Sequence, residues 1–168
     1  HLHYLRELFT IFPDATVIQT HRDPEQSIAS ICSMSLHLFA MGSDRPDAHW
    51  IGAHWRAKWA RAMERAMAFR DAAVAADPAA AARFLDVWFL DSVKDPVGTV
   101  RRVYERLGRE LTPVAEDKMR KWTEDNAREK RAAHSYTLEQ FGLSKDAIDA
   151  LFARYRERYI LARAGASE

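Results

Sequence analysis

The stretch that decides the fold covers residues 16–30 and reads TVIQTHRDPEQSIAS. Its first half is rich in β-branched residues and follows the turn signal Pro13-Asp14, so a buried strand is expected over residues 15–21. Asp23 is a typical helix N-cap, and proline is favoured at the first helical position, which Pro24 would occupy. The stretch therefore predicts a strand that passes directly into a helix.

The junction between these two elements has the chemistry of a phosphate site. Arg22 follows the predicted strand at its carboxyl edge, where ligands bind in open α/β sheets. The next helix directs its unpaired N–H groups and its positive dipole to the same place. Arg22 can contact a phosphate through paired N–H bonds, and Ser30, on the same helix face as Asp23, can add a hydroxyl. The spacing is equally consistent with a plain ion pair between Arg22 and Asp23 or Glu25.

The rest of the chain alternates helices with one further strand. Hydrophobic periodicity and capping residues predict helices over residues 2–12, 24–40, 50–76, 96–107, 113–126 and 145–160, and a strand over 83–89. Strands separated by helices imply a parallel sheet. Two strands are too few for a stable parallel sheet, and the chain opens at His1 without a methionine. We therefore expect the other strands to lie upstream in a longer protein.

Composition narrows the function classes. The chain has 168 residues, with 25 Lys plus Arg, 24 Asp plus Glu and a net charge of +1, so no general attraction to nucleic acid or to an anionic membrane is expected. The one cysteine, Cys32, excludes an internal disulfide, and no His, Cys and carboxylate pattern predicts a metal site. Without a signal peptide or an apolar run of about 18 residues, a soluble cytoplasmic protein is predicted.

A resemblance makes the phosphate site more specific. Residues 12–15 (FPDA), residues 21–24 (HRDP) and Ser30 resemble the 3′-phosphate-binding segment of sulfotransferases that use 3′-phosphoadenosine 5′-phosphosulfate (PAPS), most closely the bacterial branch. In that family an arginine at a strand end and a serine eight residues later hold the 3′-phosphate, and Arg22 and Ser30 have this spacing. The resemblance implies a three-layer α/β core of the P-loop-like class, in which residues 1–168 are part of a single domain.

Other segments extend the resemblance over most of the chain. Residues 86–96 are similar to the second strand and turn of the family, which implies that Phe89 lies against the adenine, although a core role is the alternative. Residues 131–143 resemble a C-terminal segment whose basic loop closes over the 3′-phosphate. The resemblance thereby adds four candidates for cofactor binding: Lys130, Arg131, His134 and Tyr136. A solvated loop is the alternative for the two cations.

The start of the chain suggests a catalytic base. His1-Leu2 resembles the end of a K-S-P-x-H-L segment in which the histidine takes the proton of the acceptor hydroxyl, so His1 is the candidate base and His3 lies behind it.

The resemblance implies transfer of a sulfuryl group from PAPS to a small molecule with a hydroxyl or amine, leaving 3′-phosphoadenosine 5′-phosphate (PAP) and requiring no metal. The family's loop for the 5′-phosphosulfate does not occur in the 168 residues, so the segment alone is expected to be inactive. A kinase that uses ATP and Mg²⁺, or a non-catalytic helical interaction domain, is the alternative. The charged face at residues 154–159 is expected to be solvated or to form an oligomer edge.

Overall fold

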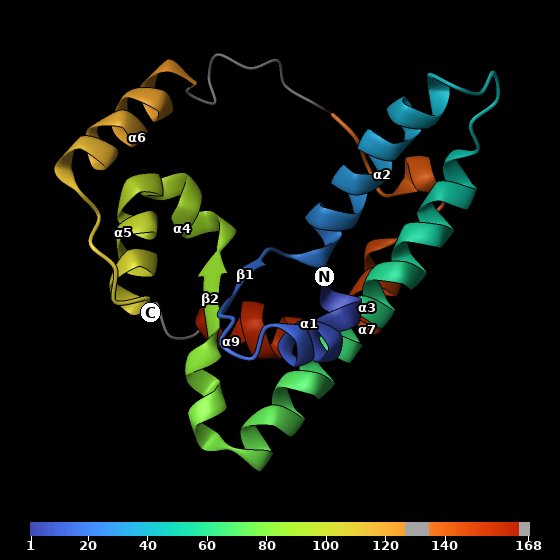
Figure 1. Cartoon of the computed structure of the whole chain (residues 1–168). Coiled ribbons are helices and arrows are strands. Elements are labelled where there is room, and N and C mark those ends of the chain that lie inside the picture. The colour runs from blue at the N-terminus through green and yellow to red at the C-terminus, as the bar shows by residue number, and fades with distance from the viewer. Residues whose placement is uncertain (127–134, 165–168) are drawn as a thin grey trace. The chain divides into compact units, whose positions relative to one another are not determined.

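The computed structural model describes residues 1–126 and 135–164 (Figure 1). Within these ranges the chain forms two compact units, which are described separately. The first unit contains the described residues of 1–15, 22–83 and 136–168, and the second contains those of 16–21 and 84–135.

The second unit is built on two parallel strands, as the sequence predicts. β1 (Val17–His21) pairs with β2 (Phe84–Trp88), in a register that places Val17 opposite Phe84 and His21 opposite Trp88. His21 is 1% exposed, and its Nε2 lies 2.9 Å from Oδ1 of Asp86 on the neighbouring strand. The imidazole and this carboxylate therefore join the two strands from one side of the pair.

In the described residues of the same unit, β2 is followed by α4 (Phe89–Lys94), α5 (Pro96–Arg106) and α6 (Pro113–Asp125). The last two begin as predicted, each with proline in the first turn. Asp95 accepts a hydrogen bond from the N–H of Gly98, and Thr112 accepts one from the N–H of Ala115. The chain leaves α5 through Gly108, whose φ of +62° is a left-handed conformation that glycine adopts without strain.

The first unit is helical. Its longer elements are α1 (Leu5–Ile11), α2 (Pro24–Ala40), α3 (Ala48–Ala76) and α7 (Lys145–Leu151). Its shorter ones are η1 (Leu2–Tyr4), η2 (Pro78–Arg83), η4 (Glu139–Phe141), α8 (Ala153–Arg156), the π-helical η5 (Glu157–Leu161) and α9 (Ala162–Ala164).

The core of this unit forms where α2, α3 and the C-terminal segments meet. α2 packs along α3 (Figure 1), and Ile28 and Cys32 of α2 are buried with Ile51 of α3 and Phe141 of η4. A Cβ at Gly52 would lie 2.1 Å from the carbonyl oxygen of Phe141, so α3 and η4 approach as closely as the absence of a side chain allows.

The structure corrects several of the predicted element boundaries; β1, for example, begins at Val17 rather than at residue 15. The second strand was predicted to include Phe89, but β2 ends at Trp88 and Phe89 begins α4. The reason lies in the pairing, because Trp88 is opposite His21, the last residue of β1, and no partner position follows. The helix predicted over residues 145–160 is instead divided at Phe152, the C-cap of α7, and continues through a π-helical turn.

Candidate functional site

The site is built around Arg22, the residue that joins β1 to α2. Its side chain is half-buried, and its Nε donates a hydrogen bond of 3.1 Å to Oε1 of Gln26, one turn along α2. This bond orients the guanidinium along the first turn of the helix. Sequence reasoning did not include Gln26, although its spacing of four residues from Arg22 was a usable signal.

The N-terminus of α2 differs from the sequence-based expectation. Its first N–H groups were expected to be available to an anion, but Asp23 accepts their hydrogen bonds. The Asp23 carboxylate accepts from the N–H of Glu25 at 3.0 Å, and its carbonyl accepts from those of Gln26 and Ser27 at 3.1 and 3.0 Å. These three N–H groups are therefore already bonded within the protein.

A cavity of about 340 Å³ lies beside Arg22 in the first unit. The residues that line it come from the start of α2, from the segment around η4 and from the start of α7: Arg22, Glu25, Gln26, Ala29, Tyr136, Thr137, Leu138, Glu139 and Lys145. Two predicted cofactor-binding residues that are far apart in the sequence, Arg22 and Tyr136, thus line the same cavity. Ser30, a half-buried residue in the second turn of α2, is not one of the lining residues.

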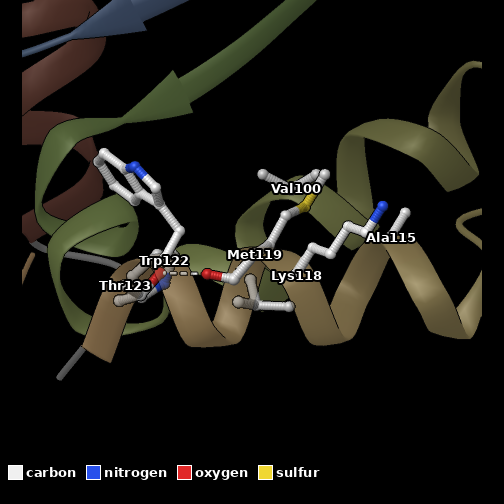
Figure 2. Close-up of a pocket in the computed structure, with 8 residues that line it drawn as sticks. Val100, Ala115, Lys118, Met119, Trp122 and Thr123 are labelled. Carbon is white, nitrogen blue, oxygen red and sulfur yellow. Dashed lines mark hydrogen bonds between the residues drawn. The ribbon is translucent and has the colours of Figure 1, made fainter. Parts of the chain in front are cut away.

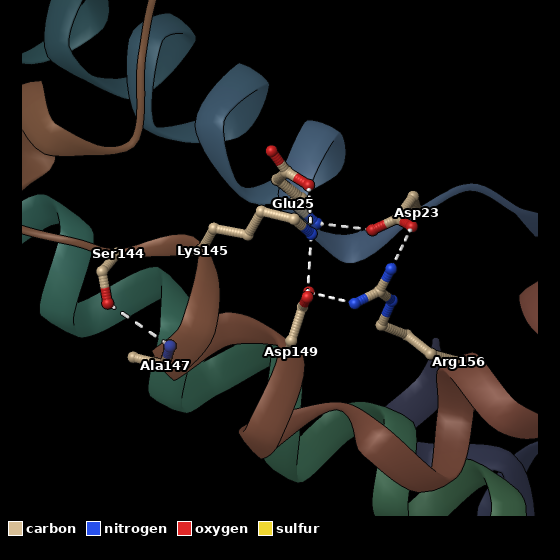
Figure 3. A network of polar contacts seen from close by, with 7 residues as sticks. All are labelled: Asp23, Glu25, Ser144, Lys145, Ala147, Asp149 and Arg156. Carbon is tan, nitrogen blue, oxygen red and sulfur yellow. Dashed lines mark hydrogen bonds and ion pairs between the residues drawn. The ribbon is translucent and has the colours of Figure 1, made fainter.

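The charges of this cavity are partly paired. Lys145 places its Nζ 2.9 Å from Oε2 of Glu25 and 2.8 Å from Oδ2 of Asp149 (Figure 3). The hydrogen bonds to these two carboxylates raise the pKa of Lys145, and the bond from Lys145 lowers the pKa of Asp149. The negative charge of Glu25 is thereby offset within the protein.

The remaining predicted site residues are not among those that line this cavity. Phe89 is half-buried at the first position of α4, in the second unit. His1 is exposed, and its carbonyl accepts a hydrogen bond from the N–H of Tyr4. His3 lines a separate cavity of about 230 Å³ between the N-terminal helices and α3. The other three, Lys130, Arg131 and His134, lie outside the described residues.

A third cavity belongs to the second unit and contains no predicted site residue. It measures about 440 Å³ and lies between α5 and α6 (Figure 2). Val100, Met119 and Trp122 give it an apolar lining, and among the described residues that line it only Lys118 is charged. Trp122 is 62% exposed. The spacing of Met119 and Trp122 on one helix face was the sequence signal for this groove.

Two further observations concern metal binding and membrane-spanning helices. In residues 1–126 and 135–164, no group of three or more His, Cys, Asp or Glu side chains is arranged to hold a metal ion. None of the helices in the described part of the chain combines the length and hydropathy that a membrane crossing requires.

Comparison with known proteins identifies the family. Residues 1–113 match the sulfotransferase family, and the chain belongs to it. Among solved structures, it is similar to the sulfotransferase STF9 from Mycobacterium avium, with a TM-score of 0.81 and 25% identity over 95% of this chain. It is also similar to the sulfotransferase STF1 from Mycobacterium tuberculosis H37Rv, with a TM-score of 0.73 and 34% identity over 91% of this chain.

These similarities confirm the predicted family and fold class, a partial α/β core of the P-loop-like kind. The chain spans 40% of the length of the STF9 chain and 37% of that of STF1. No curated protein matches the chain in sequence.

Proposed function

We propose that this chain supplies the 3′-phosphate site of a sulfotransferase that transfers a sulfuryl group from PAPS to a hydroxyl or amine. The observation that supports this function best is the cavity beside the first turn of α2. Arg22 and Tyr136, from two segments that separately resemble the cofactor-binding segments of the family, both line it. Membership of the sulfotransferase family favours this function over a kinase or an interaction domain.

The residues of the cavity fit a phosphate group. Arg22 offers a forked cation, and Tyr136 and Thr137 offer hydroxyl donors. The two acids that line the cavity do not exclude an anion, because Glu25 is paired with Lys145 and Glu139 is exposed. These side chains would supply the phosphate contacts, since the first N–H groups of α2 are already bonded to Asp23.

PAPS, when bound, supplies the activated sulfuryl group, and the residues of this chain bind and orient. Arg22 would hold the 3′-phosphate with Tyr136, and Ser30 would add its hydroxyl from the next turn of α2. Lys130, Arg131 and His134 would complete the site from the same segment as Tyr136. Phe89 would provide an apolar surface for the adenine. A ring nitrogen of His1 would accept the proton of the acceptor hydroxyl.

Calorimetric titration of the full-length protein with PAP tests this function. ATP with Mg²⁺ is titrated in parallel, and Arg22→Ala is compared with Arg61→Ala, which removes an exposed arginine of α3 that does not line the cavity. We expect PAP to bind in preference to ATP, and Arg22→Ala to lose roughly 2–4 kcal/mol of PAP affinity, as for removal of one partner of a charged contact. Arg61→Ala is expected to bind PAP as the unaltered protein does.

Two results would reject the proposed function. One is equal or weaker binding of PAP than of ATP by the unaltered protein. The other is an Arg22→Ala variant that binds PAP as tightly as Arg61→Ala. Either result would favour the alternatives, a kinase or a non-catalytic interaction domain.

A further inference from the structure

The first turn of α2 is tied to the C-terminal helices by a network of five charged side chains. Its members are Asp23, the N-cap of α2, Glu25 of the first turn, Lys145 and Asp149 of α7, and Arg156 of α8 (Figure 3). Cations and carboxylates alternate along it, from Glu25 through Lys145, Asp149 and Arg156 to Asp23. Arg156 lies beyond residues 1–113, the part of the chain that matches the family.

Arg156 forms the centre of one arm of this network. Its Nη2 donates to Oδ2 of Asp23 at 3.1 Å, and its Nη1 forms an ion pair with Asp149. The side chains of Arg156 and Asp23 are 16% and 22% exposed, so water screens this pair only in part. A guanidinium can make these two contacts at once because its N–H groups form a rigid fork.

Asp23 connects Arg156 to the first turn of α2. While Oδ2 of Asp23 accepts from Arg156, Oδ1 of the same carboxylate accepts from the N–H of Glu25 in the first turn. Both oxygens are thus engaged, and the carboxylate is fixed between two helices. Arg22 immediately precedes Asp23 in the chain. The direction in which the side chain of Arg22 leaves the backbone therefore depends on how Asp23 is held.

We propose that Arg156 is a positioning residue for the 3′-phosphate site: by holding Asp23 in its capping orientation, it sets Arg22 for contact with the phosphate. This inference rests on the proposed function. Loss of Arg156 would remove the donor to Oδ2 of Asp23 and free the carboxylate to turn out of its capping orientation. The second arm, from Lys145 to Glu25, would still hold α2 against α7.

This positioning role of Arg156 differs from that of a contact that only holds two helices together. A purely structural contact would change the binding of every nucleotide to the same degree. A positioning contact for the phosphate site would change the preference for a ligand that has a 3′-phosphate over one that lacks it. PAP and adenosine 5′-monophosphate differ by that single group, so the ratio of their dissociation constants reports on positioning.

The test measures this ratio in the full-length protein and in Arg156→Ala. Arg154→Ala is the matched control, because Arg154 lies on the same helix and forms ion pairs with Glu64 and Asp71 of α3 but none with α2. We expect the preference for PAP over adenosine 5′-monophosphate to be about tenfold lower in Arg156→Ala, a size typical of indirect coupling. Arg154→Ala should keep the preference. In an Arg22→Ala background, removal of Arg156 should have no further effect on the ratio.

An unchanged ratio in Arg156→Ala, or a further loss in the Arg22→Ala background, would overturn the inference while leaving the proposed function intact. If the unaltered protein itself shows no preference for PAP, both the proposed function and the inference fail. Should Arg156→Ala not fold, Arg156→Lys replaces it. Lysine keeps the charge but not the fork, so an unaltered preference in that variant would also reject the positioning role.

Discussion

Cys32, in the third turn of α2, has no exposed surface. It lies in the core with Ile28 and Ile51, and burial raises the pKa of its thiol to about 11. The reactive thiolate is therefore scarce at neutral pH, and reagents cannot reach it.

We expect a maleimide or disulfide reagent to label Cys32 only as fast as the folded protein opens. The measurement compares labelling rates at pH 7.5 in buffer and in concentrated guanidinium chloride, with a small free thiol as the reference. Rapid labelling of the native protein, at a rate near that of the reference, would show that this face of α2 is not buried.

The pair formed by His21 and Asp86 gives a second prediction for single residues. Asp86→Ala removes a partner of a histidine whose side chain is 0% exposed, so we expect a loss of roughly 1–3 kcal/mol in the free energy of unfolding. Asp86→Asn keeps an acceptor oxygen and should lose less. Urea unfolding of the three proteins measures the difference, and equal midpoints for all three would contradict the importance of the pair.

Sequence reasoning could propose those site residues that a local pattern indicates. Arg22 could be proposed because it lies between a predicted strand and a capped helix. Lys145 and Arg156 could not, because their partners in the first turn of α2 are more than a hundred residues away along the chain. An ion pair between helices is decided by tertiary packing, which leaves no periodic signal in a single sequence.

Among the helices, α3 and η4 approach closely at Gly52. We predict that Gly52→Ala is strongly destabilising, since its Cβ would lie 2.1 Å from a backbone oxygen that cannot move without shifting η4. Overpacking of this kind costs about 1–3 kcal/mol or more. The matched control is Gly42→Ala, because a Cβ at Gly42 would have no neighbour within 4 Å.

Thermal or urea unfolding of the two glycine variants decides this prediction. The Gly42→Ala protein should unfold close to the unaltered one, and Gly52→Ala well before it. If both variants unfold together with the unaltered protein, η4 does not pack on α3 as closely as the structure has it.

Most helices could be predicted because the residues next to their ends determine where they begin. Asp23-Pro24, Asp95-Pro96 and Thr112-Pro113 each start a helix where the sequence places it. The end of β2 could not be predicted, since it depends on the length of the strand with which it pairs. The π-helical turn of η5 is likewise without a local signal. It occurs where Tyr155 and Tyr159 are buried against Met67 of α3.

For the molecule as a whole, acid should weaken the fold. The pKa of Asp149 is lowered first by its hydrogen bond to Lys145, and that of Glu116 first by its hydrogen bond to Arg101. A carboxyl whose pKa is lower in the folded state stabilises the protein above its unfolded pKa of about 4. This contribution is lost as the pH falls through the lower, folded pKa.

We therefore expect the urea midpoint to change little between pH 7 and pH 5 on account of these groups, and to fall as the pH drops below about 4. In Asp149→Asn the fall should be shallower, because one of the titrating carboxyls is gone. A midpoint that rises on acidification, or an Asp149→Asn protein with the same acid dependence, would contradict this account.

The link between Asp23 and Arg156 also has a consequence for the order of events during protein synthesis. A ribosome releases the N-terminal segment with Arg22 well before it has added Arg156, so for most of the elongation time the first turn of α2 lacks its anchor. The nascent chain can form α2 early, but the geometry around Arg22 is completed only when the C-terminal helices emerge and dock. A premature stop codon shortly before position 156 would therefore yield a chain that keeps every residue of the recognisable motif and loses the contact that aligns it.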